Sequence, residues 1–289
     1  MISQYKEKFK EELLALGRSQ STIQAYVKDL DQFLKFCRSQ GINKVDLITD
    51  QTILGFLKKL KTKRYAPKSI SRKLNTIRTF FSLRLKNGEI KKDPSKEVKH
   101  PRIPVKKIRV LTETEYMALR DACRGNQRLY TIVEILLQTG IKIGELCRLT
   151  LADVTKDPKT KTPISIHIRE FQNNPARDIP LNKRAAEALE AYLKIRPKTN
   201  EAVIFVTAKG NPLPVRNVRL FITRAFEKAG IKGAKVNDLR NTFIVHQIQK
   251  GANLLAISKV VGHKRLSTTE RYLKYTNQEK KEEIEIEEL

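Results

Sequence analysis

The sequence predicts a mainly helical protein of two domains, the second of which contains a small β-hairpin or sheet. Three observations predict this fold class. Apolar residues recur at helical spacing along most of the chain, a basic segment with prolines interrupts that spacing near residue 100, and one short segment alternates in polarity. With 289 residues and 40% hydrophobic content, the chain is long enough to bury two cores.

The first domain is expected to span residues 1–100 and to be all helical. Ser21 and Thr22 stand where one helix would begin, and Pro67 marks the start of another. Each of these helices would bury one apolar face. The apolar residues with helical spacing are Ile23, Val27, Leu30, Leu34 and Cys37 in the first helix, and Ile70, Leu74, Ile77 and Phe81 in the second.

The next segment, residues 101–109, is expected to be an interdomain linker, because Pro101 and Pro104 break helical periodicity among basic residues. The second domain would then span residues 110–278. It opens with a capping box from Thr112 to Glu115, followed by an apolar helix from Gln127 to Thr139 that Gly140 would end.

A β-hairpin is predicted in the second domain, because residues 164–168 alternate in polarity and are rich in β-branched side chains. Residues 177–181 can pair with them across the turn-forming Asn173-Asn174-Pro175. His246 is expected to pack between helices. The predicted helices after the hairpin are Lys183 to Ile195, Val215 to Ala229, Val236 to Lys250, Asn253 to Val261 and Ser267 to Tyr275.

The last segment, residues 279–289, is acidic and opposite in sign to the rest of the chain. Three arrangements are open for it: it folds back, it docks on a neighbouring subunit, or it stays disordered.

The charge of the chain points to a polyanionic partner. The formal net charge is +27, from 58 Lys and Arg against 31 Asp and Glu, so double-stranded DNA is the leading partner. No apolar run approaches the roughly 20 residues of a membrane-spanning helix, and no secretory segment follows Met1, so a cytoplasmic, nucleoid-associated protein without a membrane partner is expected. The three cysteines and four histidines lack metal-ligand spacing, so we expect neither a metal nor a cofactor.

Four segments of the second domain occur in an order that resembles one enzyme family. Residues 139–146 (TGIKIGEL) are similar to the box TGxRxxEL, and residues 237–243 (NDLRNTF) are similar to HxLRHTF. Residues 261–263 (VGH) match LGH, and residues 267–272 (STTERY) match STTxxY. These boxes are typical of the tyrosine recombinase family, which includes the phage integrases and Xer-like recombinases. The amino-terminal helices also resemble the core-binding domain of that family, so the resemblance covers nearly the whole chain.

The resemblance implies a two-domain clamp around duplex DNA, built from a helical core-binding domain and a mixed α/β catalytic domain. A tyrosine attacks the scissile phosphate, arginines and imidazoles neutralise the transition state, and a hairpin lysine protonates the leaving 5′-oxygen. The 3′-phosphotyrosyl intermediate conserves the bond energy, so rejoining needs no ATP or metal. The protein would be a monomer or dimer when free and a tetramer on synapsed DNA.

Carried over residue by residue, the resemblance makes Tyr272 the nucleophile, Arg240 a bidentate phosphate clamp and His263 a hydrogen-bond donor to a nonbridging oxygen. Each of these three, taken alone, would more often be an ordinary packing or surface residue. Three catalytic positions depart from the family pattern: Lys142 replaces an arginine, Asn237 a histidine and Gln172 the hairpin lysine. Asn241 also replaces the histidine that follows the arginine.

These departures affect the expected rate. Loss of a preorganised transition-state contact costs roughly 10²- to 10³-fold, and loss of a general acid about 10²- to 10⁴-fold. A phosphate contact and a structural role are equally open for Lys142. Arg169, Arg177 or a nearby lysine could compensate. The candidate DNA-binding residues are Ser21, Thr22, Lys68, Ser69, Arg72, Thr76, Arg169 and Arg177, although a charged helix face is also the ordinary solvated surface.

The predicted function is a site-specific DNA recombinase that cleaves and rejoins strands through Tyr272. The substitutions at positions 142, 172 and 237 motivate an alternative, a catalytically impaired homologue that acts as a sequence-specific DNA-binding protein. A third alternative is a type IB topoisomerase, which uses similar tyrosine chemistry without strand exchange; the core-binding domain and linker weigh against it.

Overall fold

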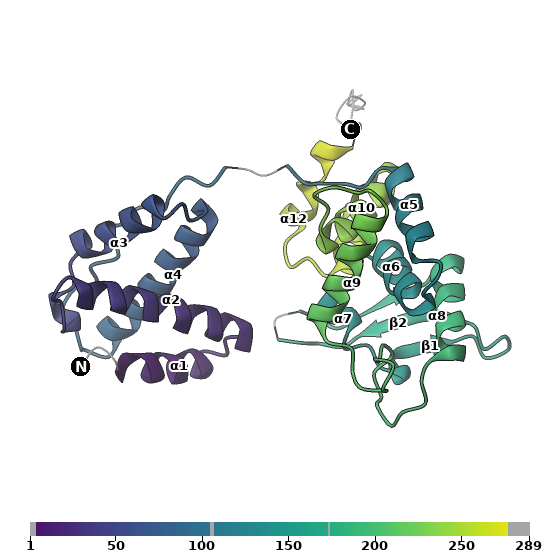
Figure 1. Cartoon of the computed structure of the whole chain (residues 1–289), viewed down its shortest axis with the longest axis horizontal. Helices are drawn as coiled ribbons and strands as arrows, with labels where there is room; N and C mark the ends of the chain where they lie inside the picture. Colours follow the sequence, from purple (N-terminus) through teal and green to yellow (C-terminus); the bar gives the residue numbers. More distant parts are fainter. Residues whose placement is uncertain (1–3, 105–106, 173, 277–289) are drawn as a thin grey trace, which may run out of the picture. The chain divides into compact units, whose positions relative to one another are not determined.

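The chain divides into two compact units, residues 1–106 and 107–289 (Figure 1). The computed structural model describes residues 4–104, 107–172 and 174–276. The change from one unit to the next falls inside segment 101–109, for which the sequence predicts a linker. The acidic segment 279–289 lies outside the described residues, and so does Asn173 of the predicted turn.

The described residues of the amino-terminal unit form helices and connecting loops, without a strand. Its helices are α1 (Tyr5–Ala15), α2 (Gln20–Ser39), α3 (Asp50–Thr62) and α4 (Pro67–Lys86), with the short 3-10 helix η2 (Val45–Leu47). Both predicted helix starts are close to the observed ones: the Ser19 side chain caps α2 by accepting from the Thr22 backbone N–H, and Pro67 is the first residue of α4.

Aromatic side chains form the centre of this unit. Phe33 meets Phe56 edge to face with ring centroids 5.2 Å apart, and Phe9 meets Phe80 at 5.7 Å. Such pairs add about 0.5–1.5 kcal/mol beyond the area that they bury. The α2 and α4 helices carry the two predicted apolar stripes, and all members except the half-buried Val27 are buried.

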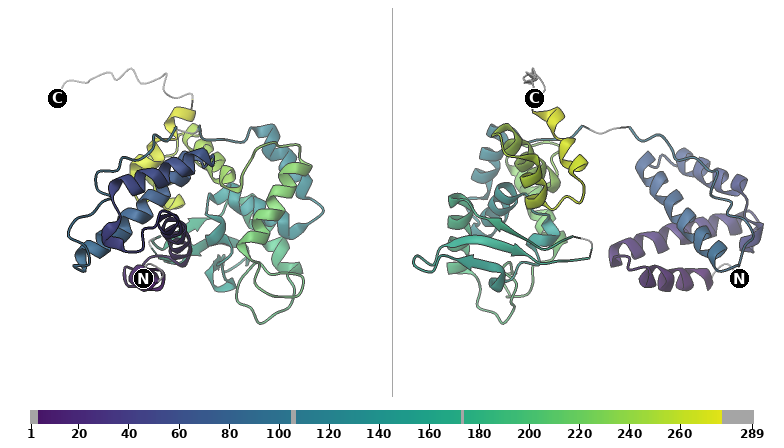
Figure 2. Two further views of the ribbon diagram at one scale, coloured as in Figure 1. Left: turned by 60° about the vertical axis from the view of Figure 1, so that its left-hand side comes forward. Right: turned by 180° about the vertical axis from the view of Figure 1, so that it is seen from behind.

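The carboxy-terminal unit contains a three-stranded antiparallel sheet of order β1-β2-β3, which lies at one side of its helices (Figure 2). The predicted hairpin is present as β2 and β3, with Ile168 opposite Arg177. The sequence did not indicate β1, because three residues are too few to show alternation. The elements are α5 (Glu113–Cys123), α6 (Gln127–Thr139), α7 (Ile143–Leu146), η3 (Leu151–Asp153), β1 (Val154–Lys156), β2 (Pro163–Ile168), β3 (Arg177–Pro180), α8 (Lys183–Ile195), α9 (Val215–Lys228), α10 (Val236–Gln249), α11 (Leu254–Val261), α12 (Leu266–Glu270) and η4 (Leu273–Tyr275).

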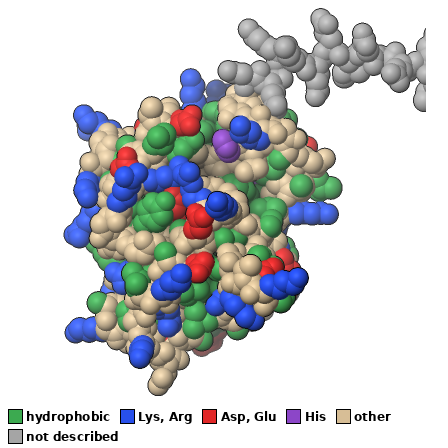
Figure 3. Space-filling view, turned by 90° about the vertical axis from the view of Figure 1, so that its right-hand side faces the viewer, with side chains coloured by type: hydrophobic (Ala, Val, Ile, Leu, Met, Phe, Trp, Pro, Cys, Tyr) green, Lys and Arg blue, Asp and Glu red, His purple; other side chains and the backbone are tan. Residues whose placement is uncertain are grey.

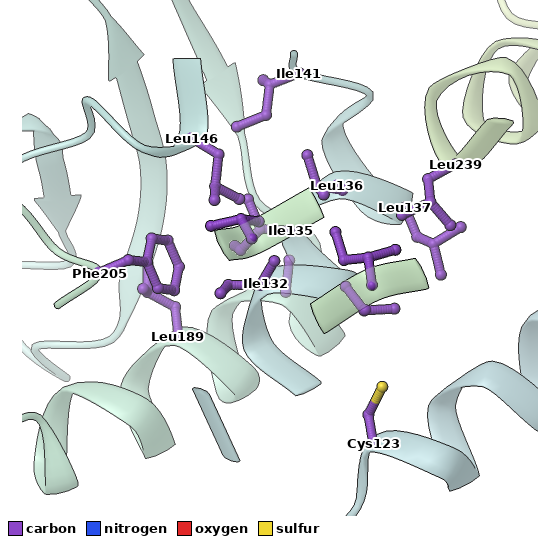
Figure 4. Close-up of a cluster of buried hydrophobic side chains, with 14 of the residues drawn as sticks. Cys123, Ile132, Ile135, Leu136, Leu137, Ile141, Leu146, Leu189, Phe205 and Leu239 are labelled. Carbon is purple, nitrogen blue, oxygen red and sulfur yellow. The ribbon is translucent and has the colours of Figure 1, made fainter. Parts of the chain in front are cut away.

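The core of this unit is built around α6, which packs against α8 and α10. In Figure 4, Ile132 and Leu136 of α6 point toward the other core side chains, including Leu146 of α7 and Leu189 of α8. Each fully buried aliphatic side chain stabilises the fold by about 1.5–3 kcal/mol. This packing fixes the ends of α6 and α10, from which the candidate site is built.

Two local predictions were wrong. The expected helix from Ser267 to Tyr275 is broken at Arg271 and Tyr272, where the Tyr272 N–H bonds to the Thr269 carbonyl in the tighter 3-10 pattern. His246, expected between helices, is exposed on α10. Helical spacing identifies an apolar face but does not say which neighbours cover the residues beside it.

Candidate active site

Tyr272 lies between α12 and η4 and is 8% exposed. Its hydroxyl donates a hydrogen bond of 3.0 Å to Asn241 Oδ1 on α10. Burial raises the pKa of Tyr272, and the positive charge of Arg240 opposes that rise. The hydroxyl is therefore neutral, fixed in direction and close to a cation.

Arg240 lies on α10 and is 5% exposed. Its Nη1 donates to the carbonyl oxygen of Gly140 at 2.7 Å. Gly140 ends α6 in the left-handed region at φ 63°, and a Cβ there would come within 2.4 Å of the Phe243 ring. Burial lowers the pKa of Arg240 to about 10, so the guanidinium remains charged at neutral pH.

His263 follows Gly262, the left-handed cap of α11. Its Nδ1 is 2.8 Å from the Thr269 hydroxyl, and its ring stacks on Tyr272 with centroids 6.2 Å apart. Burial, together with the positive charge of Arg240, lowers the pKa of His263 to about 4. The imidazole is therefore neutral at pH 7 and can offer an N–H donor but no charge.

A buried ion pair connects three elements beneath these residues. Arg177 on β3 donates to Glu145 on α7 at 2.9 Å and, through Nε, to the Val260 carbonyl at the end of α11 at 2.7 Å. Burial alone would raise the pKa of Glu145, but the hydrogen bonds from Arg177 and from the Lys142 backbone N–H lower it. A Cβ at Gly262 would meet the Arg177 guanidinium at 2.9 Å. The pair therefore holds the segment before His263 against the sheet.

Lys142 and Asn237 line a pocket of about 530 Å³ together with Arg240. The pocket also includes Lys235 and Arg219, two cationic residues that we did not identify from the sequence. Lys235 lies two residues before Asn237, within reach of the matched box, and this proximity was the available signal. The structure thus brings positive side chains from three segments around one cavity.

Gln172 is exposed at the end of the hairpin, where its φ of 56° is in the left-handed region. The backbones of Phe171 and Asn174 pair with each other on either side of it. The Asn174 side chain accepts a hydrogen bond of 2.5 Å from Lys142 Nζ. Gln172 is therefore on the loop that contacts Lys142, and no hydrogen bond connects its own side chain to the described residues of the site.

The candidate DNA-binding residues of the amino-terminal unit differ in exposure. Lys68 is exposed and Ser69 half-buried at the start of α4, whereas the Ser21 and Thr22 hydroxyls both contact Ser19 at the start of α2.

The predicted role of Thr76 requires a correction. The residue is 0% exposed and donates its hydroxyl to the Arg72 carbonyl, so it is not available to a ligand. Arg72 is exposed but forms an ion pair with buried Asp29. In the carboxy-terminal unit, Arg169 binds Asp153 at 2.6 Å, and Arg177 is occupied by Glu145.

Within residues 4–104, 107–172 and 174–276, no helix is both long and apolar enough to cross a membrane. No group of three or more His, Cys, Asp and Glu side chains in the same ranges could hold a metal ion.

A buried tyrosine stacked on a histidine, near an arginine that lines a pocket with other cations, is typical of a class of protein that acts on phosphodiesters through a tyrosine. Comparison with protein families agrees with this class. Residues 109–279 match the family model described as "Phage integrase family", and residues 7–88 match "Phage integrase, N-terminal SAM-like domain".

Individual relatives extend over most of the chain. Tyrosine recombinase XerD of Staphylococcus haemolyticus is 31% identical over 267 residues, which cover 89% of this chain and 88% of the relative. The crystal structure of XerA recombinase has a TM-score of 0.54 at 27% identity and covers 95% of both chains. A lambda integrase dimer bound to a COC′ core site has a TM-score of 0.76 at 16% identity, covering 92% of this chain and 96% of the integrase.

The chain therefore belongs to the phage integrase family of tyrosine recombinases. It is a tyrosine-type site-specific recombinase, as the sequence predicted. The alternative of a homologue with impaired activity is not favoured by these relatives, and the match to the amino-terminal SAM-like domain agrees with the argument against a type IB topoisomerase.

Proposed function

We propose that Tyr272 cleaves duplex DNA by attacking the scissile phosphate and forming a 3′-phosphotyrosyl bond. The observation that carries this proposal is the environment of the Tyr272 side chain. The side chain is buried, its ring stacks on His263, and the positive charge of Arg240 acts to lower its pKa. In-line attack requires a fixed nucleophile beside a bound phosphate. The three side chains come from different segments, so their meeting results from the fold.

Arg240 and His263 would bind the nonbridging oxygens. Arg240 already donates one N–H to Gly140, which orients its planar group and leaves further N–H donors for phosphate. Neutral His263 would contribute a hydrogen bond. A phosphate between them would gain negative charge in the transition state, where preorganised donors have their largest effect.

The proposed partner is double-stranded DNA, bound through phosphate contacts by both units in a clamp. The face in Figure 3 has Lys and Arg side chains mixed with acidic and apolar ones among the described residues, without a uniform basic patch. Phosphate contacts fix position and base contacts fix sequence, so a few base-reading residues are enough for specificity. Strand exchange between two sites, each with two protomers, requires a tetramer, and we propose that this protein forms one at the nucleoid.

The test begins with duplexes selected by binding from a random-sequence pool. Nicked suicide duplexes made from the selected sites trap any covalent intermediate, because the short strand beyond the nick diffuses away after cleavage. We expect a protein–DNA adduct that withstands denaturation, and its complete loss in Tyr272→Phe with binding unchanged. Sequence-specific binding without an adduct would refute cleavage by Tyr272.

The acidic segment 279–289 is proposed to dock on a neighbouring subunit, on the basis of its charge contrast with the rest of the chain. Truncation after Gln278 should reduce the cooperativity of DNA binding in a titration. Unchanged cooperativity would rule out this role.

A further inference from the structure

Cleavage by Tyr272 creates a need for a proton donor. When the P–O5′ bond breaks, the 5′-oxygen leaves with the bonding electron pair and must be protonated. The Gln172 amide has no acidic proton at neutral pH. Another side chain of the site has to supply the proton if the proposed function holds.

The structure brings an ammonium group to the hairpin from a different element. Lys142 precedes α7, and its Nζ donates to Asn174 Oδ1 at 2.5 Å. Asn174 is two residues after Gln172, and its backbone closes the loop by pairing with Phe171. The end of the hairpin therefore lies beside a lysine, although it has none of its own at position 172.

The same ammonium is next to the phosphate clamp. Lys142 lines the pocket that contains Arg240 and Asn237, and its side chain is 40% exposed. Its Nζ is 4.0 Å from Glu145 Oε1, too far for a hydrogen bond that would compete with a substrate oxygen. Lys142 is thus hydrogen-bonded to the hairpin through Asn174 and remains accessible to a ligand in the pocket.

Of the side chains Lys142, Arg240 and His263, Lys142 is the best suited to give up a proton. Burial lowers the pKa of Lys142, and nearby Arg240 and Arg177 lower it further against the opposing effect of Glu145. Arg240 keeps its proton at neutral pH, and His263, with a pKa of about 4, has already lost its charge. Lysines with depressed pKa values are competent acids and bases.

We propose that Lys142 is the general acid that protonates the leaving 5′-oxygen. The Tyr272 oxygen forms its bond to phosphorus and releases its proton to water, while the 5′-oxygen takes the P–O electron pair and a proton from Lys142 Nζ. The neutral amine is then reprotonated by solvent. The proposal rests on cleavage by Tyr272. It gives Lys142 the role that the family's hairpin lysine has, instead of the role of the arginine that Lys142 replaces.

The experiment compares two nicked suicide duplexes that differ in one atom, with either oxygen or sulfur bridging phosphorus and the 5′-carbon. The pKa of a thiol, about 8.5, is far below that of an alcohol or water, so the sulfur leaves without a proton donor. Lys142→Arg keeps the positive charge and restores the family's residue type, but the guanidinium holds its protons much more tightly. We expect adduct formation on the oxygen duplex to fall about 10²- to 10⁴-fold relative to the sulfur duplex, on which the arginine should not slow cleavage.

The matched variant is Lys235→Arg, in the same pocket, which should change the rates on both duplexes by the same factor. For the unmodified protein, the rate on the oxygen duplex should fall at alkaline pH while the rate on the sulfur duplex does not. Equal losses on both duplexes in Lys142→Arg, no loss on either, or a loss confined to oxygen in Lys235→Arg would each overturn the proposal. Absence of a Tyr272-dependent adduct even on the sulfur duplex would instead reject the proposed cleavage.

Discussion

The candidate active site has two halves that differ in burial. Tyr272 and Arg240, which match the family pattern, are 8% and 5% exposed and are hydrogen-bonded to the fold. Lys142, Asn237 and Gln172, which depart from it, face a pocket or solvent, whereas Asn241, which also departs, is 7% exposed and belongs to the buried half. We therefore expect substitutions in the buried half to lower both activity and the free energy of unfolding, and substitutions in the exposed half to cost little folding free energy.

The largest expected effect in this comparison is that of Arg240→Lys. The substitution retains charge but removes the planar fork and the bond to Gly140, so we expect adduct formation to slow by roughly 10²- to 10³-fold. Arg124→Lys, an exchange of the same type on an exposed arginine, is the control and should have no effect. A loss of less than threefold in Arg240→Lys would mean that the buried half is not the phosphate clamp.

Glu145→Gln tests whether the buried half also stabilises the fold. It leaves Arg177 buried without its counter-charge, which should lower the free energy of unfolding by about 3 kcal/mol. Urea denaturation measures this change. The exposed residue Glu187, 4.0 Å from Lys183, supplies the control: Glu187→Gln should cost less than about 0.5 kcal/mol. Similar losses of unfolding free energy in the two variants would show that the buried ion pair stabilises the fold no more than an exposed one.

His263 should make stability depend on pH. Its folded-state pKa of about 4 is below the ordinary value of 6.5, so the unfolded chain binds the proton more tightly. The free energy of unfolding therefore keeps its full value above pH 6.5 and falls as the pH drops toward 4. At pH 5 the loss should be about 1 kcal/mol after allowance for the partial exposure of the ring. Denaturation at pH 7.5 and 5 measures the loss, and His263→Gln should reduce it. An identical loss in His263→Gln would assign the effect to other groups.

The smallest effect is expected for Asn237→His, which restores the residue type of the family box in the exposed half. Asn237 makes one hydrogen bond of 3.2 Å, to Asn241, and is exposed, so stability should change by less than about 0.5 kcal/mol. A melting curve tests this. A loss above about 1 kcal/mol would show that the exposed half also contributes to folding.

Much of the fold could be predicted because its signals are local. The helices Gln127–Thr139 and Lys183–Ile195 were predicted with the observed ends. Their signals, the apolar spacing and the terminating Gly140, lie within or next to the helices themselves. The hairpin was found from its alternation. The break at Tyr272 was missed because it depends on contacts of Thr269 and Tyr272 with distant residues.

The site was predictable only in part, because several of its contacts join residues that are far apart in the sequence. The motifs identified the residues that meet at Tyr272, but no spacing indicates that Lys142 reaches Asn174 on the hairpin or that Lys235 lines the same pocket. Thr76 shows the opposite error, a polar residue at a plausible surface position that tertiary packing buries. Partners across long sequence separations require the folded chain.

Gly140 limits which substitutions the site can accept without rearrangement. A side chain there would collide with Phe243, and the Gly140 carbonyl accepts the hydrogen bond that orients Arg240. The Lys142 side chain, two positions later, is 40% exposed and packs against no such ring among the described residues. A substitution at the rim of the pocket can therefore change the chemical group offered to a phosphate while the backbone that orients Arg240 keeps its course.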